Sequence, residues 1–322
     1  MFIYTKADPI LKVIVVYLFI SCFFSKAPYL SFTSYISFIA VAYYYLLCLQ
    51  LKDFVFVSKI AQAIFFLNII LLVVQQFGKD TLLNFGREIP VTFGTIGNPM
   101  WLGSLLACLS PFLFISSRFN AIPLGIALFL AHSVGAMLSL LAGLALLWLP
   151  RKRLWLLVPI LAVFLFLAKD KINIQYKAGR WPVWKRTIQL INQHPFVGWG
   201  PGTYKVIFPV LSKDVAGGIP GPWEYEGTKG NWIAWRQAHN CFLQIAFETG
   251  YLGFGLFSAF IGLIIYKLWK LAKTKSREIA LSGMAIIFVN MMVHYPSRQI
   301  QIVLYLIVFL AYCNNLIKEV VR

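Results

Sequence analysis

Residues 239–266 read HNCFLQIAFETGYLGFGLFSAFIGLIIY. This run is long enough to cross a bilayer as one helix, and Glu248 is the only acidic or basic residue in it apart from the leading histidine. Similar runs recur along the 322-residue chain, which is 60% hydrophobic and 12% charged, with a mean hydropathy of +0.75. A soluble domain does not have this composition. We therefore predict an all-α polytopic membrane protein, because helices satisfy their own backbone groups in lipid.

The apolar runs predict about ten transmembrane helices, two of them short. The first run, Leu11 to Phe24, has no small-residue cleavage site and is followed by further spans, so we expect a retained anchor rather than a signal peptide. The predicted segments are 10–25, 29–50, 54–76, 98–117, 120–131, 133–149, 154–168, 240–266, 278–296 and 299–317.

The basic residues predict which loops are cytoplasmic. The net charge of +18 could indicate nucleic-acid binding, but in a membrane protein it is typical of cytoplasmic loops, so we expect no nucleic-acid partner. The inside clusters are Lys6 with Lys12, Lys52 with Lys59, Arg151–Arg153, Lys267–Arg277, and Lys318 with Arg322. All four histidines then lie on or near the outer side.

The two short helices are predicted from the number of membrane crossings between basic clusters. Arg118 and the cluster Arg151–Arg153 should both be inside, so an even number of crossings must join them. The stretch between them, about 30 residues, is too short for two full spans. We predict two short helices that turn near His132–Ser133 on the outer side. The alternative is one long helix with Arg118 outside.

The stretch Lys169 to Ala238 is the strongly polar part of the chain, with ten Lys and Arg against four Asp and Glu. It divides the chain into N-terminal membrane helices (1–168), a large periplasmic loop (169–238) and C-terminal membrane helices (239–322). Loops of this length translocate largely regardless of charge, so a basic outer loop is allowed but is not explained by topology. We therefore look for chemistry in this loop.

Three blocks predicted to be outside carry the candidate functional residues. In the first, GREIPVTFGTIGNPMWL (86–102), Asn98 can cap a helix that begins at Pro99, and Arg87 lies just upstream. The second is GRWPVWKRTIQLINQHPFVGWGP (179–201), and the third begins at His239, where the chain re-enters the membrane.

The second block predicts an amphipathic helix and a turn. Trp184, Ile188 and Ile191 have helical spacing, so residues 181–192 should form an interfacial helix, with Arg180, Lys185 and Arg186 directed towards headgroups. Residues 198–202, GWGPG, predict a tight turn. As a phosphate-binding motif this turn is weak, since it follows no strand and opens no obvious phosphate-binding helix.

In this order the blocks resemble the O-antigen ligase and polymerase superfamily of bacterial membrane glycosyltransferases, over residues 80–300. The matching elements are Arg87, Gly97-Asn98-Pro99, Arg180 with Trp184, His194–Gly200, His239-Asn240 and Glu248–Gly253. Two positions depart from the family pattern. Met100 stands where many relatives have Asn, and Val134 stands where they often have an Arg. If that Arg holds a phosphate, Arg87, Lys185 or His132 must serve instead, although His132 is otherwise expected to be structural.

The resemblance implies a fold similar to C-type glycosyltransferases and an active site facing the periplasm of a bacterial inner membrane. The donor would be a glycan on polyprenyl (undecaprenyl) pyrophosphate. The acceptor would be lipid A-core for an O-antigen ligase, our leading hypothesis, another lipid-linked glycan for a polymerase, or a protein for an O-oligosaccharyltransferase. A transporter of lipid-linked glycan is the alternative outside enzymes. Transporters usually place ionisable groups near mid-membrane and carry repeats, and this sequence shows neither.

The reaction needs a base for the acceptor hydroxyl and cations for the leaving pyrophosphate. The resemblance favours His239 as the base, with an interfacial helix cap as its structural alternative. Candidate pyrophosphate ligands are Arg180, Arg87, Lys185 and Arg236, because guanidinium groups match phosphate oxygens. Expected supporting residues are Asn240, Trp184, Glu248 and Asn98. His194 is expected to brace the turn before Pro195.

We expect no cofactor and no metal. The sequence contains no Asp-x-Asp, and its close acidic pair, Glu224 with Glu226, lies in a basic loop where Lys or Arg can neutralise it. The five cysteines form no CxxC pair, so neither a zinc site nor a disulfide framework is predicted.

Overall fold

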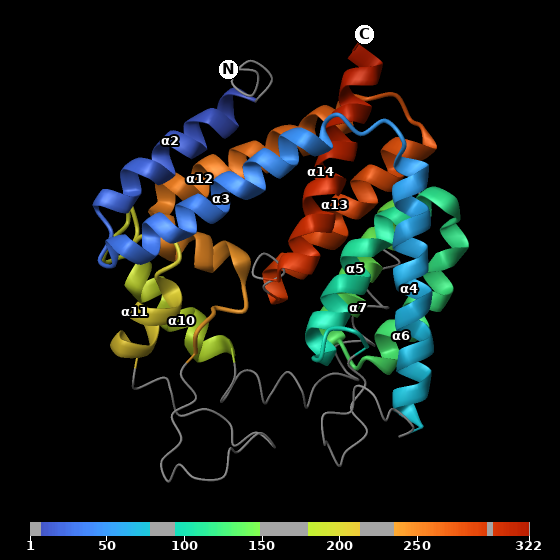
Figure 1. Ribbon diagram of the computed structural model, residues 1–322, viewed down its shortest axis with the longest axis horizontal. Helices are drawn as coiled ribbons and strands as arrows, with labels where there is room; N and C mark the ends of the chain where they lie inside the picture. Colours follow the sequence, from blue (N-terminus) through green and yellow to red (C-terminus); the bar gives the residue numbers. More distant parts are fainter. Residues whose placement is uncertain (1–7, 78–93, 149–179, 213–234, 295–298, 322) are drawn as a thin grey trace. The chain divides into compact units, whose positions relative to one another are not determined.

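The computed structural model describes residues 8–77, 94–148, 180–212, 235–294 and 299–321 (Figure 1). Every regular element in these residues is helical, which confirms the predicted all-α class there. The elements are α2 (Pro9–Phe23), α3 (Pro28–Cys48), α4 (Phe54–Gln76), α5 (Pro99–Ser116), η1 (Arg118–Asn120), α6 (Ala121–Leu130), α7 (Val134–Trp148), α10 (Arg180–Ile191), α11 (Tyr204–Leu211), α12 (Cys241–Lys270), α13 (Lys275–Val293) and α14 (Ile300–Val321).

Among these residues, six helices are long and apolar enough to cross a membrane: α3, α4, α5, α12, α13 and α14. Three further apolar segments are shorter, namely α2, α7, and η1 with α6. The exposed faces of these helices carry large apolar side chains, such as Phe19, Phe66 and Ile70, as lipid contact requires. The chain is therefore a multi-pass membrane protein. The predicted segment 154–168 lies outside the described residues.

The chain forms two compact units. The first unit comprises Met1–Ala42 and Pro159–Ile261, and the second comprises Tyr43–Val158 and Gly262–Arg322. The predicted division at residues 168 and 238 follows the polarity of the sequence and stays a prediction.

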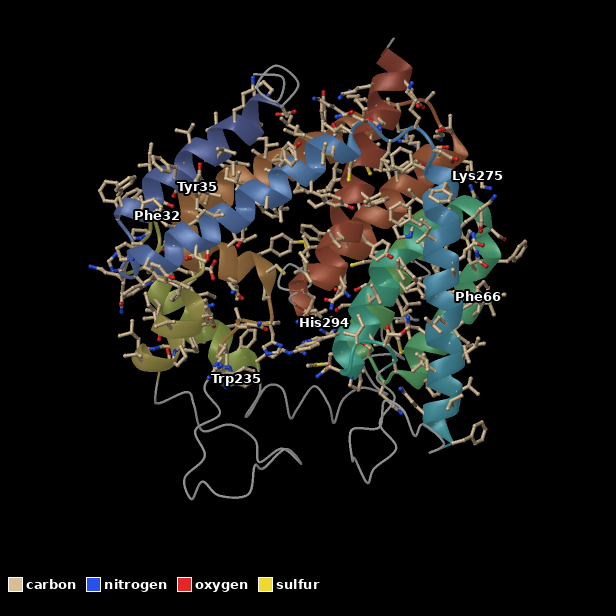
Figure 2. The ribbon with its side chains drawn as sticks, viewed as in Figure 1. Phe32, Tyr35, Phe66, Trp235, Lys275 and His294 are labelled. Carbon is tan, nitrogen blue, oxygen red and sulfur yellow. The ribbon has the colours of Figure 1, made fainter. Side chains whose placement is uncertain are left out.

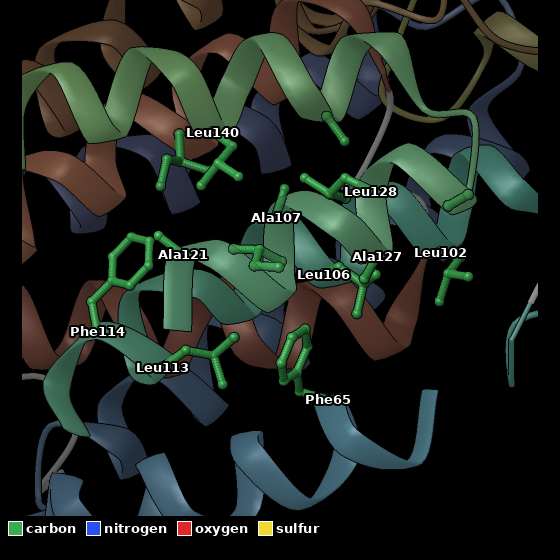
Figure 3. Close-up of a cluster of buried hydrophobic side chains, with 14 of the residues drawn as sticks. Phe65, Leu102, Leu106, Ala107, Leu113, Phe114, Ala121, Ala127, Leu128 and Leu140 are labelled. Carbon is green, nitrogen blue, oxygen red and sulfur yellow. The ribbon is translucent and has the colours of Figure 1, made fainter. Parts of the chain in front are cut away.

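The second unit has a core of buried apolar side chains from α4, α5, α6, α7 and α13, including Phe65, Leu106 and Leu140 (Figure 3). Helices α7 and α13 approach closely through glycines, as is common between membrane helices. A Cβ on Gly143 would collide with Ile286, and one on Gly135 would lie 2.6 Å from the His294 ring. These two contacts make α7 and α13 antiparallel.

The predicted pair of short helices is confirmed, and the alternative of one long helix is wrong. Helix α6 ends at Leu130 and α7 begins at Val134, with His132 between them at φ 49°. Asn and His adopt this left-handed conformation more readily than most residues, which suits a tight turn. Arg118 forms an ion pair with Glu278 (N–O 2.7 Å), in the first turn of α13.

The start of α5 also follows the prediction. Asn98 Oδ1 accepts hydrogen bonds from Met100 N (2.9 Å) and Trp101 N (3.4 Å), and Pro99 occupies the first helical position, where no amide donor is needed. Helix α5 is then buried along most of its length.

In the first unit, α2 and α3 pack through aromatic rings. Phe19 of α2 lies 6.1 Å from Phe32 and 5.5 Å from Tyr35 of α3, measured between ring centroids (Figure 2). A cluster of buried apolar side chains in this unit joins α10, α11 and the beginning of α12. It contains Val183, Leu190, Tyr204, Phe208 and Phe247. Residues from both ends of the polar loop therefore share one core with α12.

Candidate active site at the beginning of α12

A break in α12 organises the candidate site. Gly250 has φ 66° and ψ −177°, a conformation that essentially only glycine adopts, and it divides the helix into two parts. The break frees backbone carbonyls of the preceding turn to bond elsewhere. Trp199 N donates to Phe247 O (3.0 Å), Gly200 N donates to Glu248 O (2.9 Å), and Tyr251 N donates to Pro195 O (2.6 Å).

The segment His194–Gly200 therefore interlocks with the broken turn Glu248–Gly253. The two backbones approach so closely that a Cβ on Gly198 would lie 2.5 Å from Gly250 N, and one on Gly250 would lie 2.7 Å from Val197 N. Tyr17 of α2 adds hydrogen bonds from its hydroxyl to Phe196 O and Thr249 O. Two motifs that are about 50 residues apart in sequence thus form one structural element.

The turn at residues 198–202 is built as predicted, with positive φ at Gly198, Gly200 and Gly202. The turn is followed by a helix, α11 (Tyr204–Leu211). A carboxylate of the protein itself lies at the start of this helix, because Gly202 N donates to Glu248 Oε2 (2.8 Å) just before α11. A carboxylate is favoured near a helix N-terminus, so this turn holds Glu248.

His239 lies directly before α12 and has φ 52°. Its ring is 5.4 Å from that of Trp235 in an edge-to-face contact. A positive φ in a residue with a Cβ costs energy and persists only where the surroundings enforce it. Such residues cluster at functional sites, and among the described residues His239 shares this conformation with His132 at the turn between α6 and α7.

Hydrogen bonds hold both neighbours of His239. Trp184 Nε1 of α10 donates to Ala238 O (2.7 Å), and Ala238 N donates to Gln244 Oε1 (3.4 Å). On the other side, Asn240 Oδ1 accepts from Leu243 N (3.1 Å), which caps α12. The conformation of His239 is therefore determined from α10 and from the first turn of α12 at once.

The hydrogen bonds continue from Gln244 to the turn. Gln244 Nε2 donates to Glu248 Oε1 (3.1 Å), while Glu248 Oε2 accepts from Gly202 N. Gln244 and Glu248 are buried, with 5% and 8% of their surfaces exposed. Glu248 is thus a structural partner in this geometry, and its role in catalysis stays a prediction.

Helix α10 carries the predicted cations. It spans Arg180–Ile191, close to the expected 181–192. Arg180 and Trp184 are four residues apart and so lie on one face of the helix, the face that reaches the backbone before His239. Lys185 and Arg236 are exposed to solvent. The structure therefore places Arg180, Lys185, Arg236, Trp184 and His239 in one unit.

One expectation for α10 is wrong, namely the direction of Arg186. The side chains buried within the protein are Val183, Thr187, Leu190 and Ile191, whereas Ile188 is 45% exposed. Thr187 fits this face because its hydroxyl bonds Val183 O (2.7 Å) and lies 2.9 Å from the Tyr204 hydroxyl. Arg186 does not project towards headgroups, because its guanidinium donates to Leu211 O at the end of α11. Unsatisfied carbonyls at a helix C-terminus attract such donors.

His194 braces the turn, as expected. Its ring lies 4.2 Å from that of Trp199, and its carbonyl accepts from Gly198 N (3.0 Å). Partial burial lowers the pKa of His194, and the nearby Lys26 ammonium lowers it further. Protonation of this imidazole is therefore less favourable than that of a free histidine.

Arg87, a predicted pyrophosphate ligand, is outside the described residues. Glu224 and Glu226, which were not expected to bind a metal, are also outside them. Asn98 belongs to the second unit, where it caps α5. Among the described residues, no group of three or more His, Cys, Asp and Glu could hold a metal ion.

Sequence reasoning missed Gln244. A signal for it was present, because Asn240, Gln244 and Glu248 recur at intervals of four in an otherwise apolar run. That spacing places the three polar side chains on one helical face. Their partners, however, come from distant segments that only the fold brings together.

The fold and the site define a multi-pass helical membrane protein with a histidine at the beginning of a broken membrane helix. Residues 119–258 match a family model described as O-Antigen ligase. This match includes α10, the turn at 198–202, His239 and Glu248, and it supports the predicted resemblance to the O-antigen ligase superfamily. A search of the curated proteins finds no match to the chain.

Proposed function

We propose that the protein transfers a saccharide from polyprenyl (undecaprenyl) pyrophosphate to an acceptor hydroxyl at the periplasmic face of a bacterial inner membrane. The observation that carries this proposal is the enforced left-handed conformation of His239, with a tryptophan and a glutamine bonding the residue before it. The family match supports the same class of reaction.

In the proposed reaction, His239 accepts the proton of the acceptor hydroxyl. The acceptor oxygen forms a bond to the anomeric carbon, and the bond from that carbon to the pyrophosphate oxygen breaks. The polyprenyl pyrophosphate leaves with the electron pair. A histidine suits this step because its ordinary pKa lies near the working pH.

Arg180, Lys185 and Arg236 are proposed to bind the pyrophosphate, together with Arg87. A charge pair at about 4 Å contributes on the order of 4 kcal/mol at an effective dielectric near 20. Two such contacts that strengthen as the leaving oxygen gains charge would accelerate the reaction by several powers of ten. The sequence has no Asp-x-Asp, so we propose that these cations replace a divalent metal.

The proposed acceptor is lipid A-core, as for an O-antigen ligase. The test is reconstitution with a defined polyprenyl-pyrophosphate saccharide, with lipid A-core, a second lipid-linked saccharide and a peptide as competing acceptors, with and without chelator. We expect transfer to lipid A-core that chelator does not abolish. Product made only from the second lipid-linked saccharide would indicate a polymerase, and transfer only to peptide a protein oligosaccharyltransferase. No transfer to any acceptor would contradict the proposal.

The proposed periplasmic location has its own test. All five native cysteines are buried, so an introduced exposed cysteine can be labelled selectively. Lys205 of α11 and Lys273, which follows α12, are both exposed. A membrane-impermeant maleimide should label Lys205→Cys in intact spheroplasts and Lys273→Cys only after permeabilisation. The reverse pattern would place the candidate site in the cytosol and refute the proposed location.

A further inference from the structure

Gln244 occupies a central position between the elements of the site. It lies in the first turns of α12 and is 5% exposed, and both the oxygen and the nitrogen of its side-chain amide form hydrogen bonds. The oxygen accepts from Ala238 N, and the nitrogen donates to Glu248 Oε1. Both partners lie next to site elements, since Ala238 precedes His239 and Glu248 bonds Gly202 before α11.

The hydrogen bonds around Gln244 have a fixed order of donors and acceptors. Gly202 N donates to Glu248, which accepts at both oxygens, so residue 244 must donate to Glu248 and accept from Ala238 N. A glutamine side chain meets both requirements, because its amide oxygen accepts and its amide nitrogen donates. A carboxylate at position 244 would face Glu248 as a second acceptor, and an aliphatic residue would leave the Ala238 amide and Glu248 without this partner.

The bond to Ala238 bears directly on the histidine. Ala238 O is held by Trp184 Nε1 and Ala238 N by Gln244 Oε1, so the residue that precedes His239 is fixed at both its donor and its acceptor. With φ of 52°, His239 could relax towards a commoner conformation if either bond were lost. That relaxation would turn the imidazole away from its present direction.

We propose that Gln244 is a positioning residue. It links the buried carboxylate of Glu248 to the backbone amide of Ala238, and this link fixes the direction of the His239 imidazole. This inference rests on the proposed function, in which His239 is the base. Gln244 does not contact substrate. It acts on the proton transfer through the backbone, whereas the cations of α10 do not depend on it.

The test exchanges the two side chains. In Gln244→Glu, two carboxylates oppose each other, and we expect kcat to fall on the order of 100-fold, as for a misplaced catalytic group. The donor KM should stay within about threefold, because the proposed ligands Arg180 and Lys185 belong to a different helix, α10. In the double variant Gln244→Glu with Glu248→Gln, residue 248 donates to residue 244 while its oxygen accepts from Gly202 N. All three bonds are restored, and kcat should return to within about tenfold of the native value.

The outcomes separate this inference from the proposed function. Retained kcat in Gln244→Glu overturns the positioning role, and so does a folded double variant that stays as slow as the single one. If the double variant does not fold, Gln244→Met decides, with lowered kcat at unchanged donor KM supporting the role and unchanged kcat overturning it. His239→Asn serves as the reference: if it keeps full activity, the proposed function fails, whereas an inactive His239→Asn beside fully active Gln244 variants refutes only the positioning role.

Discussion

Gly250→Ala tests whether the interlock between His194–Gly200 and the broken turn of α12 holds the site together. Gly250 has φ 66° and ψ −177°, where a side chain is strained whatever the space around it. The new methyl group would also lie 2.7 Å from Val197 N, which belongs to backbone and cannot move aside cheaply. The substitution must therefore displace the turn or straighten the helix.

The expected cost has two parts. A residue forced into this region of backbone conformation costs about 1–3 kcal/mol. Displacing the turn breaks the bonds Trp199 N to Phe247 O, Gly200 N to Glu248 O and Tyr251 N to Pro195 O, each worth about 1 kcal/mol net. Since these bonds form one network they do not add fully, and we expect a total loss of about 4 kcal/mol.

The assay is thermal unfolding of the purified protein in detergent, with glycan transfer measured in parallel. A loss of this size should lower Tm on the order of 10 °C and abolish most transfer. Gly255→Ala is the matched control in the same helix, because its backbone is helical and a Cβ added there would meet no atom within 4 Å. It should be neutral or stabilise by up to about 1 kcal/mol. Equal Tm values for the two variants would refute the interlock.

Three further substitutions test separate contacts. Trp184→Phe removes the hydrogen bond to Ala238 O and should lower kcat by about 10- to 100-fold with a small change in Tm, measured by transfer and unfolding assays. Asn98→Ala removes the cap of α5 and should cost about 1 kcal/mol in thermal unfolding. His194→Gln should flatten the fall in Tm between pH about 7 and 5, because burial and Lys26 lower the pKa of the folded imidazole, so that protonation favours the unfolded chain.

Controls for these variants come from the same elements. Trp181 of α10 is 53% exposed, and Trp181→Phe should leave kcat near the native value, so equal losses at positions 181 and 184 would contradict the role of the indole bond. An Asn98→Ser variant keeps a capping oxygen and should recover most of the loss of Asn98→Ala. A pH profile of His194→Gln as steep as that of the native protein would assign the acid sensitivity to other groups.

The sequence predicted the helices well because lipid leaves few choices. Apolar runs of the length of a bilayer must be helical, and caps such as Asn98-Pro99 mark where they begin. The parity of basic residues also predicted the short pair α6 and α7, which the ion pair of Arg118 with Glu278 supports. These features are local, or depend on charge counts that a sequence displays directly.

Contacts inside the protein decide which face of α10 is buried, and apolar character alone does not reveal them. Thr187 is buried because its hydroxyl bonds Val183 O and lies beside the Tyr204 hydroxyl. Arg186 likewise finds the carbonyl of Leu211. Tyr204 and Leu211 belong to α11, which no pattern in the sequence connects to α10.

The candidate site, too, could be predicted only in part. His239, Asn240 and Glu248 were visible from their motif, but the function of the spacing between them was not. Gln244 and the turn at Gly202 become related only when α11 and α12 pack together. The hydrogen bond between Gly202 and Glu248, which are 46 residues apart, cannot be deduced from spacing, because loop length does not fix where a loop returns.

The most direct measurement compares His239→Asn with His132→Asn in the reconstituted transfer reaction. Both histidines have positive φ, 52° and 49°, and asparagine tolerates this conformation, so both backbones should be retained while the imidazole is lost. We predict that His239→Asn loses about 10²- to 10⁴-fold in kcat, as expected for loss of a general base, and that His132→Asn keeps its rate. Native-like kcat in a folded His239→Asn would contradict the assignment of His239 as the base.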